Sequence, residues 1–172
     1  MSLAPLSFAS ALHHYEEHAE SLHAALLAGE PAAEWRVKWM HPRFRGKAID
    51  AVRAASLERD DARMVLALEH GFASWANVAA FADAVQHPGP IADFELAVEA
   101  IVDGDLAPLR AMLRAHPALV RARSTRRHRA TLLHYIAANG VEGERQRTPP
   151  NAVEIARTLH DAGATPDAVA DM

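Results

Sequence analysis

The chain has no cysteine among its 172 residues. This absence excludes disulfide bonds, thiol chemistry and zinc sites built from thiolates. Long apolar runs are also missing, because no stretch approaches the roughly 18 residues that read as a membrane-spanning helix, and the first residues do not resemble a signal peptide. We therefore expect a cytoplasmic protein that does not enter a membrane.

A strong charge of either sign is missing too. The formal net charge of -4 and the pI of about 6.2 give no overall attraction to nucleic acid or to an anionic membrane, so such binding would need a local patch. The eight glycines are scattered and form no phosphate-binding loop. Neither a Gly-x-Ser-x-Gly elbow nor a catalytic triad pattern is present. The sequence therefore predicts no catalytic residue, no bound metal and no cofactor.

Apolar spacing predicts helices throughout the first half of the chain. Apolar residues recur three and four positions apart from Leu12 to Leu26, which predicts a helix from near Ser7 to Gly29. Further helices are expected over residues 31–40, 48–55, 57–70 and 75–85, with Ser74 as the N-cap of the last. No stretch shows convincing strand alternation, so the predicted fold class is all-α.

The residues from His87 to Pro90 break the helical pattern and mark the predicted domain boundary. Residues 1–87 form a helical N-terminal capping region in this interpretation. Residues 91–172 read as two helical hairpins, the first over 94–102 and 106–115, the second over 131–139 and 152–162. Asp93, Asp105 and Asn151 are the expected N-caps. A helical hairpin that recurs is typical of a solenoid repeat.

Two segments carry a resemblance to a known family. Residues 129–140, Arg-Ala-Thr-Leu-Leu-His-Tyr-Ile-Ala-Ala-Asn-Gly, resemble the first half of the ankyrin-repeat signature, with Leu132 where that pattern has proline. Residues 151–167 are similar to its second half, although Thr158 and His160 depart from it. Residues 65–78 resemble the helical segment that precedes the repeats in a group of bacterial ankyrin proteins.

The resemblance implies an ankyrin-type α-solenoid of about two repeats: a divergent one over 91–128, a second over 129–168, and the start of a third at 169–172. The two repeats align with an offset of 46 residues, whereas an ankyrin unit has about 33. The excess falls in an insertion over 141–150. The outer face after the second repeat is left uncovered, which indicates a fragment of a longer array or a homodimer through that face.

Ankyrin-like packing also implies roles for individual residues. Thr131 hydrogen-bonds His134, the small Ala137 and Ala138 let the paired helix approach, and Gly140 and Gly163 take positive φ. The layer between the helices is filled by Leu133, Ile136, Val153, Ile155 and Leu159.

The resemblance implies a non-enzymatic interaction module that binds a protein partner. Five arginines lie within the nine residues 121–129, where an ankyrin finger projects into solvent. Guanidinium groups bind acidic or phosphate-bearing groups in a bidentate way. The predicted partner-binding residues are Arg123, Arg126, Arg127, Arg129, Arg145 and Arg147. Two alternatives remain open: a solvated loop balanced by nearby acidic residues, and a finger that binds nucleic acid or a phosphate ligand.

The histidines and tryptophans invite other interpretations. His14 and His18 lie four residues apart on the first predicted helix, a spacing that can present two imidazoles to one metal ion. A metal-dependent hydrolase would use His13, His14, His18 or His41. Trp35, Trp39 and Trp75 could form a platform for bases or sugars, but their helical spacing beside leucine and methionine favours the core.

Overall fold

A computed structural model describes residues 6, 7, 9–137 and 148–171. The chain is mostly helical and forms no β-strand within these residues, which confirms the all-α prediction. The elements of the N-terminal half are α1 (Leu12–Leu27), α2 (Pro31–Met40), η1 (Pro42–Phe44), α3 (Ile49–Arg53), α4 (Arg59–Glu69) and α5 (Trp75–Ala84). Those of the C-terminal half are α6 (Pro90–Asp103), α7 (Leu106–Ala115), η2 (Pro117–Arg121), α8 (His134–Ala137) and α9 (Ala152–Asp161).

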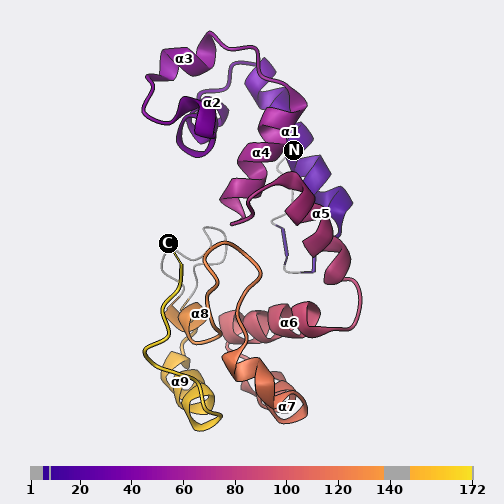
Figure 1. The fold of residues 1–172 in the computed structure, drawn as a ribbon, viewed down its shortest axis with the longest axis vertical. Coiled ribbons are helices and arrows are strands. Elements are labelled where there is room, and N and C mark those ends of the chain that lie inside the picture. Colours follow the sequence, from indigo (N-terminus) through magenta and orange to yellow (C-terminus); the bar gives the residue numbers. More distant parts are fainter. Residues whose placement is uncertain (1–5, 8, 138–147, 172) are drawn as a thin grey trace.

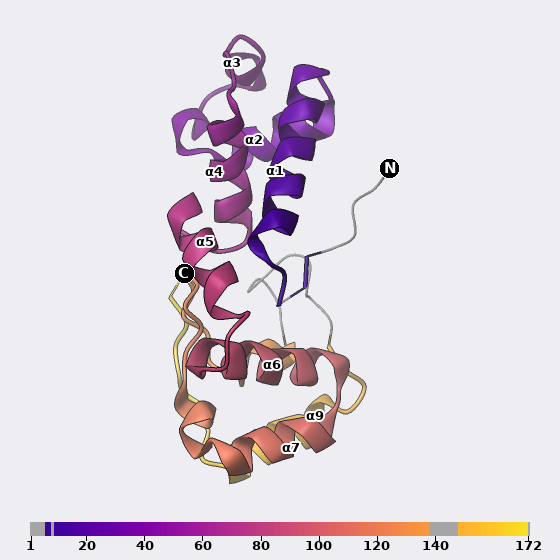
Figure 2. The same ribbon diagram turned by 90° about the vertical axis from the view of Figure 1, so that its right-hand side faces the viewer.

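The N-terminal half is organised around α1 and α4, which lie along each other (Figures 1 and 2). The predicted apolar stripe of α1 faces inward, since Tyr15, Ala19 and Leu22 are buried. The helix begins at Leu12 rather than near Ser7. Ser7 and Ser10 form a turn instead, in which the Ser7 N–H donates to the Ser10 hydroxyl at 2.8 Å. Serine side chains that bond to nearby backbone in this way compete with helix formation.

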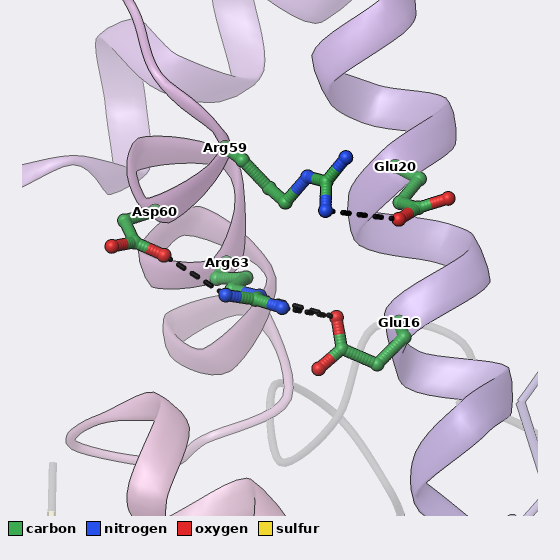
Figure 3. A network of polar contacts seen from close by, with 5 residues as sticks. All are labelled: Glu16, Glu20, Arg59, Asp60 and Arg63. Atoms are coloured by element: carbon green, nitrogen blue, oxygen red, sulfur yellow. Dashed lines mark hydrogen bonds and ion pairs between the residues drawn. The ribbon is translucent and has the colours of Figure 1, made fainter.

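Ion pairs on the solvent side fix α1 against α4 (Figure 3). Arg63 donates to Glu16 on α1 at 2.8 Å and to Asp60 on its own helix at 3.0 Å, while Arg59 lies 3.4 Å from Glu20. The hydrogen bond to Glu16 raises the pKa of the Arg63 guanidinium, against the opposing effect of its partial burial. Exposed pairs of this kind contribute little to stability one by one. They add polar links between the two helices at the surface.

The C-terminal half consists of two helical hairpins, α6 with α7 and α8 with α9. Both views place α7 and α9 side by side, and Arg110 on α7 donates to Glu154 on α9 at 3.1 Å (Figures 1 and 2). Buried positions recur at the predicted offset of 46 residues. Leu109 and Ile155 are both fully buried, and Leu113 and Leu159 also belong to the same core cluster. The two hairpins therefore use equivalent positions to fill one core.

Two predicted N-caps, Asp93 and Asn151, are wrong. Helix α6 begins at Pro90 rather than Phe94, with Gly89 at the N-cap position. The proline N–H is missing only where the first turn would leave it unbonded, so Pro90 can be the first residue of the helix. The domain boundary at residues 87–90 stays a prediction. The Asn151 side chain does not cap α9; its Nδ2 donates to the Gly104 carbonyl at 2.8 Å and links the two hairpins. The predicted caps Ser74 and Asp105 are confirmed.

The same contact makes Gly104 sensitive to substitution. Its φ is +77°, and a Cβ would lie 2.7 Å from the Asn151 Oδ1. We expect Gly104→Ala to lower the free energy of unfolding by about 2–3 kcal/mol, part from backbone strain and part from displacing Asn151. Gly46 has a similar φ of +76° but no atom within 4 Å of such a Cβ, so Gly46→Ala should cost only about 1 kcal/mol. Equal losses in urea unfolding would contradict this difference.

Every helix in the described part of the chain is too short or too polar to cross a membrane. The cytoplasmic location stays a prediction.

Candidate functional site

The arginine-rich segment does not project freely into solvent. Arg123 and Thr131 form an antiparallel bridge, and the Ser124 N–H donates to the Ala130 carbonyl at 2.8 Å, so residues 123–131 make a narrow hairpin. Figure 1 shows this orange hairpin reaching from the C-terminal half toward α4 and α5. Its tip docks there, because the Arg127 N–H donates to the Gly71 carbonyl at 2.7 Å.

Arg126 is the anchor of this contact and is 2% exposed. Its guanidinium carbon lies 5.2 Å from the centre of the Phe72 ring and 4.5 Å from that of Phe81. The Nη1 donates to the buried Glu95 carboxylate on α6 at 2.8 Å, and the Nε donates to the His70 carbonyl at 3.2 Å. The prediction that Arg126 contacts a partner is therefore wrong. Aromatic faces and a carboxylate stabilise the planar guanidinium in the interior.

The other predicted partner-binding arginines divide into three kinds. Arg123 is exposed, yet its Nη1 donates to the carbonyls of Arg129 and Val169, both at 2.8 Å. Arg127 and Arg129 keep exposed side chains, and Arg129 holds a positive φ of 46° at the turn. Arg145 and Arg147 lie outside the described residues. The hairpin thus contacts both halves of the chain, and among the predicted arginines that the structure describes, Arg127 and Arg129 are the two whose side chains are exposed and make no hydrogen bond or ion pair with a described residue.

The predictions for the residues of the ankyrin-like motif are confirmed in part. The Thr131–His134 hydrogen bond is confirmed, since the Thr131 N–H donates to the His134 Nδ1 at 3.2 Å and the hydroxyl oxygen lies 2.9 Å from the same nitrogen. Gly163 has the predicted positive φ, at 98°. The core layer contains the predicted Leu133, Ile136, Ile155 and Leu159.

Two motif predictions are wrong. Val153 is 65% exposed, because it lies on the side of α9 opposite to the buried Ile155, and Ala137 is exposed at the end of α8 rather than packed against a helix. Ala138 and Gly140 lie outside the described residues.

The histidines proposed for a metal site do not form a ligand set. The rings of His13 and His14 lie 3.9 Å apart at the exposed start of α1. His41 instead contacts Asp61 at 3.1 Å, and its Nδ1 accepts the Arg43 N–H. Within the described ranges, no three His, Asp or Glu side chains are grouped so that they could hold a metal ion.

The tryptophans of α2 face solvent, which contradicts the prediction that they are core. Trp35 is 44% and Trp39 69% exposed, with ring centroids 6.1 Å apart and planes 18° from parallel. Ala33 and Val37 are also four residues apart, and these two are buried. Each tryptophan follows one of them by two positions, a rotation of about 200° around the helix. The indoles therefore point away from the core. Trp75 is half-buried beneath Arg63.

One cation lies against an exposed indole, whereas Arg43 and Lys47 in the following turn lie over the Phe44 ring, 5.1 Å and 5.8 Å from its centre. The Lys38 ammonium lies 4.7 Å from the centre of the Trp39 ring, and the turn after α2 carries Arg43, Arg45 and Lys47. These four cations make no ion pair with any described carboxylate, whereas the nearby Glu34 and Glu69 bind Arg53 and Arg36. Residues 35–47 hold five of the 18 Lys and Arg residues and none of the 22 Asp and Glu residues. We call Trp35, Lys38, Trp39, Met40 and the turn 43–47 the α2 surface.

Fluorescence quenching tests this geometry. We expect iodide to quench tryptophan emission at least about twice as strongly as caesium at low salt, because the exposed indoles lie in a positive local field. The double variant Lys38→Glu/Lys47→Glu should reduce or invert the ratio of the two Stern–Volmer constants, while Arg127→Glu should leave it unchanged. A ratio that does not respond to Lys38 and Lys47 would contradict the arrangement.

No family model matches this chain, and comparisons with curated proteins and with solved structures find no similar protein.

Proposed function

We propose that this chain is a non-enzymatic interaction module that binds a protein partner through the α2 surface. The observation that carries the proposal is the exposure of Trp35 and Trp39 on the face of α2 opposite to the core. Tryptophan, methionine and arginine are enriched in protein interfaces, and buried tryptophans supply much of the binding energy there. Trp35 and Trp39 keep 44% and 69% of their surface exposed, so the fold gains only part of the energy that their burial could supply, and a partner that covers the rings accounts for their position.

We further propose that the C-terminal half is an ankyrin-type pair of repeats that supports this surface. The side-by-side hairpins, the equivalent buried positions, the Thr131–His134 bond and the positive φ of Gly163 favour this interpretation. The hairpin at residues 123–131 then corresponds to a finger that has folded onto the N-terminal half. One observation supports the predicted homodimer through the last hairpin: Val153 and Val169 are exposed.

Chemical cross-linking of the tagged chain in extracts of its source cells tests the function. We expect Trp35→Ala/Trp39→Ala to lower the yield of cross-linked partner at least about tenfold, because each lost indole removes a large contact. The same variant should change the free energy of unfolding by less than about 0.5 kcal/mol, since neither ring packs in the core.

Arg127→Ala/Arg129→Ala is the matched control, because it truncates two exposed side chains on the originally predicted finger. An undiminished yield with the tryptophan variant, or a loss confined to the arginine variant, would overturn the assignment of the α2 surface.

A further inference from the structure

Resting on the proposed function, we infer that the partner docks an acidic polypeptide segment, one that also carries apolar side chains, on the α2 surface. The exposed indoles suit the apolar side chains of such a segment, and the cations suit its acidic groups. The indoles are those of Trp35 and Trp39, and the cations are Lys38, Arg43, Arg45 and Lys47.

Charge complementarity is the first argument. The carboxylates that flank residues 35–47 in the sequence are occupied within the fold: Glu34 binds Arg53 at 2.9 Å, and Asp50 lies 3.3 Å from the same guanidinium. The four cations of the α2 surface have no such carboxylate among the described residues, so their field is directed at solvent. Opposite charge across an interface speeds association and selects among partners. A partner that covers the indoles together with Lys38 and the turn 43–47 is therefore favoured when it carries anionic groups.

Apolar contacts are the second argument. Met40 is 38% exposed beside the tryptophans, and a pocket of 280 Å³ opens near the start of α2. It lies outside the α2 surface itself, and its lining combines Leu26, Leu27, Val52 and Leu57 with the Glu34–Arg53 pair and Ser56. Leu27 is 73% exposed at its rim. A pocket of this kind accepts an aliphatic side chain from an amphipathic segment, as helix-in-groove recognition requires.

The same features favour a polypeptide over a nucleic acid. The bases of a nucleic acid are planar and carry at most one methyl group each, so they fill a pocket lined partly by leucine less well than a branched aliphatic side chain does. The chain as a whole carries a net charge of -4, which opposes a long polyanion that extends beyond the basic turn. A short acidic segment meets only the local field, because salt screens charges beyond about 10 Å.

Fluorescence anisotropy with three labelled probes tests the inference on the full chain. The first is a peptide of about 16 residues with leucine on one helical face and glutamate elsewhere, the second replaces each glutamate with lysine, and the third is a single-stranded oligo(dT) of similar length. We expect the glutamate peptide to bind at least about tenfold more tightly than either of the others, with an affinity that falls as salt rises.

Variants locate the binding. Trp35→Ala/Trp39→Ala and Lys38→Glu/Arg45→Glu should each weaken the glutamate peptide at least about tenfold, whereas Arg127→Glu/Arg129→Glu should change it less than about twofold. Three results would overturn the inference: no glutamate-peptide binding at about 100 μM, equal binding of the lysine peptide, or tighter binding of oligo(dT).

Cross-linking of the native partner separates this inference from the proposed function. If Trp35→Ala/Trp39→Ala removes the partner and Lys38→Glu/Arg45→Glu does not, the interaction surface stands and the acidic partner is refuted. If the tryptophan variant leaves the partner in place, the proposed function itself fails.

Discussion

Arg126→Ala is expected to lower the free energy of unfolding by about 3–5 kcal/mol, the range found when one partner of a buried ion pair is removed. The substitution takes away the cation 2.8 Å from the buried Glu95 carboxylate. It also removes the contacts of the guanidinium with the adjoining Phe72 and Phe81 rings and the hydrogen bond to the His70 carbonyl. Because these groups come from both halves of the chain, the loss of their contacts should also make the two halves unfold less cooperatively. Urea unfolding followed by circular dichroism measures it.

Arg127→Ala is the matched control, because the neighbouring side chain is exposed and should cost less than about 0.5 kcal/mol. A second variant separates charge from packing. Arg126→Met/Glu95→Leu removes both charges while it keeps apolar volume, so it should recover about half or more of the loss. If Arg126→Ala proves as mild as Arg127→Ala, the buried position assigned to the guanidinium is refuted.

Leu132→Ala is expected to cost about 3 kcal/mol through the cavity that it leaves. Leu132 is fully buried in the core cluster of the C-terminal half, beside the residues of both hairpins. In the ankyrin-type repeat that we propose, this position corresponds to a proline, so a large loss would show that Leu132 acts here as a packing residue. The unfolding midpoint in urea, at constant slope, gives the value.

Val153→Ala provides the comparison for that experiment, because it also shortens an aliphatic side chain but at a position that is 65% exposed. We expect a change below about 0.5 kcal/mol. Similar losses for both variants would mean that the core assignment of Leu132 or the exposure of Val153 is wrong.

Most of the helices could be predicted because their determinants are local. The Ser74 and Asp105 caps lie within three residues of the N–H groups that they accept, and the stripe from Tyr15 to Leu22 is visible as a simple spacing. Asn151 shows where local reasoning ends. Its side chain could cap its own helix, but the Gly104 carbonyl, 47 residues away, accepts its N–H instead.

The candidate functional residues were harder to predict, because their roles depend on contacts with residues far away in the sequence. Nothing near Arg126 in the sequence shows that Phe72, Phe81 and Glu95 will surround it, and a run of arginines is ordinarily exposed. The prediction that the tryptophans of α2 are core was wrong for a different reason. Spacing of four residues places Trp35 with Trp39, and equally Ala33 with Val37, without deciding which pair faces inward. The lack of any acidic residue in 35–47 was the one available indication of a solvent-facing, cationic surface.

The central claim is that the exposed indoles bind the partner while the arginine hairpin joins the two halves. The most direct test is to purify the partner identified by cross-linking and to measure its affinity for two variants of the chain. We predict that Trp35→Ala/Trp39→Ala weakens binding at least about a hundredfold with unchanged stability, and that Arg123→Ala/Arg127→Ala/Arg129→Ala binds within about threefold of the parent chain. The reverse order, with the arginine variant losing the partner and the tryptophan variant retaining it, would contradict the account.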